Sequence, residues 1–174
     1  DHLQEAAAIM GRAAEIDPLN LARQRDLADV RNALGRLFLS RGEARYAEAE
    51  ARLAQQIADR LLERSRDDRQ AARLRGVSLE LQGRAWERQG NRQKAAGAWT
   101  EAVAALEPVA QRSRDYEFLD PWALALLGAG RIDDSKEVVQ TLAAIGYRNP
   151  MFITAISRRG IRMRAFRHRR GRRV

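Results

Sequence analysis

The sequence contains no cysteine, which excludes disulfide bonds, zinc–thiolate centres and cysteine nucleophiles. Proline and glycine are scarce, at 4 and 12 residues, and aromatic residues make up only 6% of the chain. Runs of Val, Ile, Thr and Tyr, which favour strands, are almost absent. Ala, Leu, Arg, Glu and Gln dominate instead, and each of these favours helices. The composition therefore predicts an all-α fold.

Long apolar runs are also missing. The longest, around residues 122–129, is far shorter than the roughly 20 residues that a transmembrane helix needs. The first residues are acidic and polar, unlike a signal peptide, which has a basic start followed by an apolar run. The chain lacks an initiator Met, so we expect it to be a piece of a longer protein. Without an export signal, cytoplasm is the default compartment.

Catalytic motifs are absent from the sequence as well. The two histidines, His2 and His168, lie near the termini, and neither has a second metal ligand at helical spacing. There is no glycine-rich phosphate loop, no Gly-x-Ser-x-Gly motif and no plausible nucleophile–base pair. The acidic pairs at 67–68 and 133–134 lie at predicted helix starts, where they complement the positive end of the helix dipole. We expect no enzyme activity, no cofactor and no metal site.

A regular pattern of small and bulky residues occupies the middle of the chain. Its members, separated by 3, 4, 5, 4, 3 and 6 positions, are Gly83, Trp86, Gly90, Ala95, Trp99, Ala102 and Pro108. Two alanines seven positions apart, with a bulky residue between them, allow two helices to approach closely and interlock. The central glycine suits a tight turn that requires positive φ. Similar patterns span residues 34–54 and 119–142, and residues 6–18 match the second half alone.

The pattern resembles the tetratricopeptide repeat, in which Leu-Gly-x-x-Tyr, a turn glycine, Ala-x-x-x-Phe-x-x-Ala and Pro follow one another. Trp86 and Trp99 stand at its two aromatic positions, so we expect core roles for them rather than a ligand cage, whereas Trp122 lies outside the strict phase. Successive copies start about 41, 48 and 40 residues apart, more than the 34 residues of that repeat. This difference predicts extended helices and longer connections.

The resemblance implies a right-handed superhelical solenoid of antiparallel helix pairs. We expect helices near residues 2–16, 20–40, 43–65, 69–89, 92–112, 119–129 and 133–145. Residues 1–18 would be the trailing helix of a truncated repeat, 19–148 the repeats, and 158–174 a basic tail. Between them, Asn149-Pro150 predicts the start of a capping helix over 149–157, which would cover the last repeat.

In tetratricopeptide arrays, the first helix of each repeat lines a concave groove that holds a peptide or a partner helix. The resemblance implies groove candidates of mixed charge, namely Asp29, Asn32, Arg36, Glu80, Arg84, Glu87, Glu117, Asp120 and Leu124. A clamp for a terminal carboxylate is not supported, because Leu81, Glu117 and Pro121 stand where further donors are needed. We expect an internal segment or a folded surface as the ligand. The alternative is that these side chains are merely solvated.

The last 17 residues contain nine arginines and no acid, so they account for the whole net charge of +9, and residues 1–157 are neutral overall. The nine are Arg158, Arg159, Arg162, Arg164, Arg167, Arg169, Arg170, Arg172 and Arg173. Such a tail is able to bind phosphates with a steep salt dependence, an acidic protein or an anionic membrane surface. It is equally compatible with a solvated extension of an Arg-rich chain. Phe166 is its only aromatic residue, which disfavours base stacking.

The sequence predicts a non-catalytic scaffold that binds a peptide or a folded protein. Residues 119–131 and 145–150 resemble the C-terminal repeats of some bacterial serine/threonine kinases and winged-helix regulators. That resemblance implies a sensor or partner-recruiting module of a larger signalling protein. Two alternatives stay open: an adaptor that binds nucleic acid through the tail, and a regulatory segment of an enzyme whose active site lies upstream. The oligomeric state is not predicted.

Overall fold

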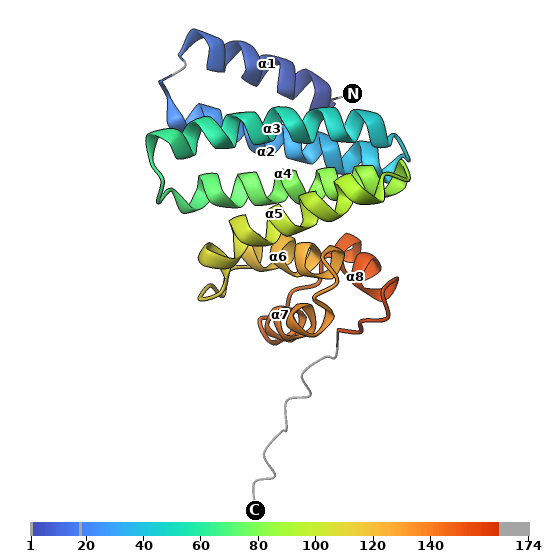
Figure 1. Cartoon of the computed structure of the whole chain (residues 1–174). Coiled ribbons are helices and arrows are strands. Elements are labelled where there is room, and N and C mark those ends of the chain that lie inside the picture. Colours follow the sequence, from blue (N-terminus) through green and yellow to red (C-terminus); the bar gives the residue numbers. More distant parts are fainter. Residues whose placement is uncertain (1, 18, 164–174) are drawn as a thin grey trace, which may run out of the picture.

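The computed structural model describes residues 2–17 and 19–163, which form eight helices and no strand (Figure 1). The helices are α1 (His2–Ile16), α2 (Leu21–Ser40), α3 (Ala44–Arg64), α4 (Arg69–Arg88), α5 (Arg92–Ala110), α6 (Tyr116–Gly128), α7 (Ile132–Ala144) and α8 (Pro150–Ser157). The all-α prediction is confirmed for this part of the chain. None of these eight helices is both long and apolar enough to cross a bilayer.

Polar side chains determine where several of the helices begin. Asp68 accepts hydrogen bonds from the backbone N–H groups of Gln70 and Ala71, at 3.0 and 3.1 Å, and thereby starts α4. Asp115 accepts from the backbone N–H of Glu117 at 2.9 Å. Because of this cap, α6 begins at Tyr116 instead of residue 119, where the sequence pattern placed its start.

The same turn joins the two helices of three consecutive pairs. The glycines that follow α2, α4 and α6, with φ of 82°, 78° and 79°, are Gly42, Gly90 and Gly130. In the second of these turns, the N–H of Gly90 donates to the carbonyl of Glu87 at 3.1 Å, and the next N–H donates to the carbonyl of Trp86 at 2.9 Å. The other two turns repeat both bonds. Glycine adopts this left-handed conformation without steric cost, so the predicted turn glycines are confirmed.

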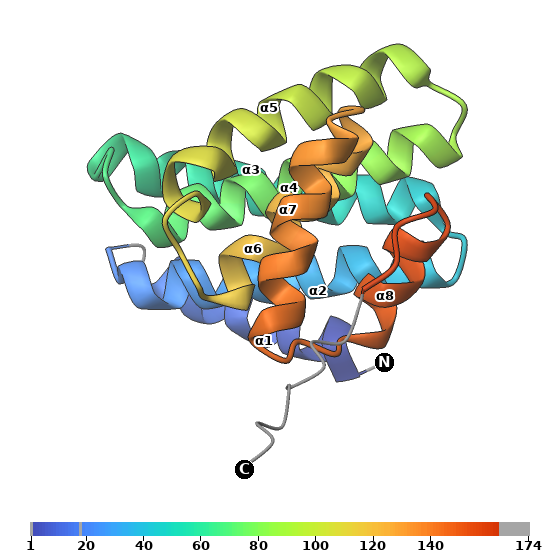
Figure 2. The ribbon, with the colours of Figure 1, turned by 90° about the horizontal axis from the view of Figure 1, so that it is seen from below.

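The helices lie in two rows. Each helix from α1 to α6 packs against the next one in the sequence, and in addition α2 contacts α4 and α4 contacts α6. We call α2, α4 and α6 the A row, and α3, α5 and α7 the B row. Figure 2 shows α3 and α5 on one side of α4, with α2, α6 and α8 on the other. Alternate helices of the chain thus build one continuous face.

Glycines allow the two rows to approach closely around Trp99 of α5. Its indole ring is buried between α4 and α6, and each of these helices offers it a glycine, Gly83 and Gly128. A Cβ at Gly83 would lie 2.7 Å from the ring, and a Cβ at Gly128 would lie closer still. The expected core role of Trp99 is confirmed. Trp86 is only half-buried, with the Lys94 ammonium 5.8 Å from its ring centre.

Candidate functional site

The predicted groove residues all lie on the A row, three on each helix. They are Asp29, Asn32 and Arg36 on α2, Glu80, Arg84 and Glu87 on α4, and Glu117, Asp120 and Leu124 on α6. Four of them form a charged group that spans the row, which we call the central cluster: Arg36, Glu80, Arg84 and Asp120. Both of its arginines interact electrostatically with both of its carboxylates. The three helices therefore bring together charges that are distant in the sequence.

Both carboxylates of the central cluster are largely removed from water. Glu80 is only 2% exposed, and Nη1 of Arg84 donates to its Oε1 at 3.4 Å. Burial raises the pKa of Glu80 above its ordinary value, against the opposing effect of Arg84 and Arg36. Burial likewise raises the pKa of Asp120, against a hydrogen bond from Tyr147 and the same two arginines. The arginines compensate charges that would otherwise be costly at this depth.

Tyr147, which the sequence pattern did not single out, covers one side of the central cluster. Its hydroxyl donates to Oδ2 of Asp120, and its ring stacks on Tyr116 at 5.3 Å and meets the edge of Phe152 at 5.6 Å. Burial and the adjacent Asp120 carboxylate raise the pKa of the Tyr147 hydroxyl. Tyr147 lies just before α8, so this bond ties the start of the C-terminal segment to the A row.

Asn32 does not present its side chain to a groove. It is 0% exposed, its Oδ1 accepts from Oγ of Ser78 at 3.0 Å, and its Nδ2 donates to the carbonyl of Leu74 at 3.5 Å. The amide therefore links α2 to α4 inside the molecule. A buried amide with two partners is a structural contact, which removes Asn32 from the set of residues that a partner is able to touch.

Two other groove candidates pair with arginines of the same chain. Asp29 receives two hydrogen bonds from Nη2 of Arg73 on α4, at 2.9 and 3.1 Å. Glu87 pairs with Arg159 at 2.6 Å, although the two residues are 72 positions apart. Both carboxylates keep about half of their surface exposed, at 48% and 49%. These two ion pairs leave a carboxylate edge open to solvent. Glu117 is exposed as well.

The helix expected within residues 149–157 is α8, and it lies against α6 of the A row. It packs on α6 through Phe152 and Ile156, which are 2% and 0% exposed, and the turn after it reaches α4 through the Arg159–Glu87 pair. Between α4, α6 and the end of α8 lies a hollow of about 150 Å³, which we call the α8 hollow. The chain itself therefore covers the C-terminal part of the predicted groove.

Comparisons of the chain with protein-family models, curated proteins and solved structures give no match. The functional interpretation therefore rests on the structure itself, to which the α8 hollow adds a charged site. Its charged lining consists of Glu80, Arg84, Glu87, Arg88, Arg158 and Arg159, and Leu124 contributes an apolar wall. Arg88 follows Arg84 by one helical turn, and that spacing was a usable signal in the sequence. No sequence signal brings Arg158 next to α4.

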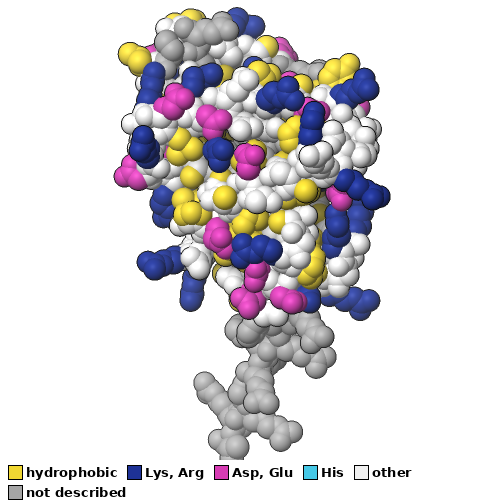
Figure 3. All heavy atoms as spheres, in the orientation of Figure 1, with side chains coloured by type: hydrophobic (Ala, Val, Ile, Leu, Met, Phe, Trp, Pro, Cys, Tyr) yellow, Lys and Arg dark blue, Asp and Glu magenta, His cyan; other side chains and the backbone are white. Residues whose placement is uncertain are grey.

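Three of the nine tail arginines, Arg158, Arg159 and Arg162, belong to the part of the chain that the structure describes, and the other six lie outside the described residues. Arg158 and Arg159 directly follow α8 and line the α8 hollow. Elsewhere, basic and acidic side chains alternate over the face shown in Figure 3, in accord with the neutrality of residues 1–157. The excess positive charge therefore starts at this hollow.

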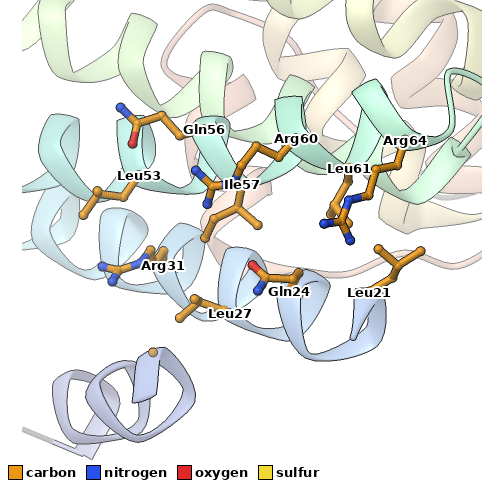
Figure 4. A pocket seen from close by; sticks show the side chains of 11 residues that line it. Leu21, Gln24, Leu27, Arg31, Leu53, Gln56, Ile57, Arg60, Leu61 and Arg64 are labelled. Atoms are coloured by element: carbon orange, nitrogen blue, oxygen red, sulfur yellow. The ribbon is translucent and has the colours of Figure 1, made fainter. Parts of the chain in front are cut away.

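A second hollow, of about 490 Å³, lies between α1, α2 and α3 (Figure 4). Leu27, Ile57 and Leu61 contribute apolar walls, and Arg60 and Arg64 extend from α3 toward α2. The sequence pattern did not predict this hollow. Its width depends on how far α1 stands from α3, and residue spacing within single helices carries no information on that distance. Within residues 2–17 and 19–163, no three His, Asp or Glu side chains gather closely enough to hold a metal ion.

Proposed function

We propose that the chain is a non-catalytic interaction scaffold of tetratricopeptide-like repeats, and that the A row binds an extended peptide or the surface of a protein partner. The observation that carries this proposal is the threefold repetition of one unit. The pairs α2–α3, α4–α5 and α6–α7 share the same glycine turn, and successive A-row helices contact one another. Stacking of equal units produces a solenoid in which one row forms an inner, concave face.

In this proposal, α1 is the trailing helix of a preceding unit and α8 is the cap that covers residues 19–148 at their C-terminal side. The buried residues of α1 and α8 support these roles, because Ala7 packs against the first pair and Ile156 against the last. A terminal unit of a repeat array has no neighbour, so it requires such a cover. A scaffold of this kind also suits a sensor or partner-recruiting module of a larger bacterial signalling protein.

The contacts offered to a partner are charges of both signs held in fixed positions. Arg36 and Arg84 are half-buried, Arg84 donates to Glu80 on its own helix, and both guanidinium groups interact electrostatically with Glu80 and Asp120. Glu87 and Asp29 keep exposed carboxylate edges. Charged groups that are fixed before binding lose little conformational freedom when a partner arrives, which favours specific recognition. The partner is thus a segment with polar and charged side chains of both signs.

The test is crosslinking of the intact chain to its partner, with mass spectrometry to place the crosslinks. We expect crosslinks on α2, α4 and α6, and at least tenfold weaker capture by Arg36→Gln/Glu87→Gln, since each interfacial charge–charge contact contributes about 1.5–3 kcal/mol. Arg60→Gln/Asp59→Asn is a matched control, because it also removes one charge of each sign but on α3. If the control weakens capture as much as the A-row variant, the proposed binding face is wrong.

A second candidate function is an adaptor that binds nucleic acid through residues 158–174. The confinement of the whole net charge of +9 to that segment favours it. In that case, deletion of 158–174 abolishes binding, and the logarithm of the affinity falls linearly with the logarithm of the salt concentration. Binding that survives the deletion and varies little with salt excludes this candidate.

A further inference from the structure

Four guanidinium groups meet at the α8 hollow. Arg84 and Arg88 come from successive turns of α4, and Arg158 and Arg159 come from the end of α8, 70 or more positions away in the sequence. The hollow measures about 150 Å³, less than a third of the 490 Å³ between α1 and α3. Like charges that meet in one concave space repel one another, and all of them attract an anion that enters it.

The lining carboxylates compensate only half of this charge. Glu80 pairs with Arg84 at 3.4 Å, and Glu87 pairs with Arg159 at 2.6 Å. Arg88 donates to a neutral acceptor, the backbone carbonyl of Leu39. The guanidinium of Arg158 has no hydrogen bond or ion pair with any residue in 2–17 or 19–163. Four arginines against two glutamates thus leave a surplus of two positive charges, on Arg88 and Arg158.

The electrostatic state of Arg88 agrees with this surplus. Burial lowers the pKa of its guanidinium, and the positive charges of Arg84 and Arg158 lower it further, against the effect of Glu87. Arg84 and Arg158 create a positive potential at Arg88, which disfavours the charge of its guanidinium. The same potential would favour a bound anion.

We propose that the α8 hollow binds the phosphoryl group of a phosphorylated side chain on the peptide that occupies the A row. This inference rests on the proposed function, since it names the chemistry of the partner at one end of the binding face. A phosphate monoester carries close to two negative charges near neutral pH, which matches the surplus of two. Guanidinium groups donate in a planar fork that fits phosphate oxygens, and Leu124 offers an apolar contact to the carbon that bears the phosphate.

A phosphodiester backbone fits the hollow less well. Each diester group carries one negative charge, and a nucleic acid is bound along a row of positive groups that follows its backbone. The arginines of this hollow form a compact group and not a row, and the adjoining A row carries the acids Glu117 and Asp120 on α6. A single monoester at the end of a side chain is small enough to contact Arg88 and Arg158, because Glu80 and Glu87 are already paired with Arg84 and Arg159.

The test is calorimetric titration of the full-length chain with inorganic phosphate, with a partner-derived phosphopeptide and with its unphosphorylated form. We expect inorganic phosphate to bind, and Arg158→Gln to weaken its binding about tenfold or more, because a hydrogen bond to a charged group contributes about 1.5–3 kcal/mol. The side chain of Arg158 makes no hydrogen bond or ion pair within the described residues, and its backbone bond to Thr154 does not depend on the side chain, so this variant should keep the wild-type circular dichroism and melting temperature. Arg88→Gln provides a second variant from the other side of the hollow.

The matched control is Arg60→Gln, which removes one exposed positive charge from α3, far from the hollow. If the control weakens phosphate binding as much as Arg158→Gln, the binding is a property of overall charge and the inference is wrong. It is wrong also if phosphate does not bind, or if an oligonucleotide displaces the phosphopeptide with an affinity that depends on Arg158. If inorganic phosphate and the phosphopeptide bind with equal affinity, the peptide contributes nothing to binding. The proposal that the phosphoryl group belongs to a peptide on the A row would then be wrong.

The results separate this inference from the proposed function. Partner capture that depends on Arg36 and Glu87, together with no effect of phosphorylation or of Arg158→Gln, would leave the scaffold in place and remove the phosphoryl site. Phosphate binding that depends on Arg158, together with no partner on the A row, would leave an anion site and remove the scaffold.

Discussion

Replacement of Gly83 by alanine provides the most direct test of how the two rows of helices fit together. The new Cβ would lie 2.7, 2.8 and 3.0 Å from three ring atoms of Trp99, so the ring or α4 must move by several tenths of an ångström. The Trp99 ring cannot simply move away from α4, because Gly128 of α6 is already packed against it. Overpacking of this kind costs about 1–3 kcal/mol. The better helix propensity of alanine offsets about 1 kcal/mol of that cost.

The matched variant is Gly97→Ala on α5, where the new Cβ would meet no atom within 4 Å. It gains the same propensity without the clash, so we expect it to stabilise the chain by up to about 1 kcal/mol. The difference between the two variants isolates the steric cost of about 1–3 kcal/mol, or roughly 2–12 °C in melting temperature for a chain of this length. Thermal and urea unfolding followed by circular dichroism measure it. Equal stabilities for Gly83→Ala and Gly97→Ala would refute the clamped position of Trp99.

Three further predictions concern the central cluster and α8. Because burial raises the pKa of Glu80, its contribution to stability is present at low pH and is lost as pH rises through the raised value. Glu80→Gln should therefore gain stability relative to wild type as the pH of urea unfolding experiments rises above 4.5, the ordinary pKa of the carboxyl group, and a constant difference would contradict this. Tyr147→Phe removes the hydroxyl that donates to Asp120 and should cost about 1–3 kcal/mol in the same assay, whereas an unchanged midpoint would show that the bond contributes nothing. Asn149→Ala removes the side chain that caps α8 at 2.9 and 3.3 Å and should cost about 1 kcal/mol, which hydrogen exchange of the α8 amides would report as faster exchange.

The features that the sequence predicted are those that depend on local geometry. A glycine at Gly42, Gly90 or Gly130 acts within its own turn, because the left-handed conformation is a property of one residue. The spacing of Gly83, Trp99 and Ala102 reports which face of each helix is buried, since that face repeats every 3.6 residues. The same periodicity placed Arg36, Glu80, Arg84 and Asp120 on one face. Their meeting in one cluster required only that alternate helices lie side by side.

Other features depend on distances between elements that the sequence pattern does not encode. Asn32 and Arg36 are four positions apart and share a helical face, yet Asn32 is fully buried because Ser78 and Leu74 lie opposite it. Whether a polar residue on that face meets solvent or another helix depends on the angle between α2 and α4. The approach of Arg158 to α4 depends in turn on where a short helix settles, and no periodicity connects the two segments.

The position of α8 separates the A row into two parts that differ in charge. Toward α2 the row offers carboxylates and guanidinium groups that interact with one another, so it presents charges of both signs to a partner and favours neither sign. At the α8 hollow, Arg88 and Arg158 form no ion pair with an acid among the described residues, so an anion that enters there breaks no ion pair. Selectivity for an anionic group is therefore concentrated at the end of the row that α8 encloses. The rest of the row contributes shape and orientation, because its charges are held in place by their own partners.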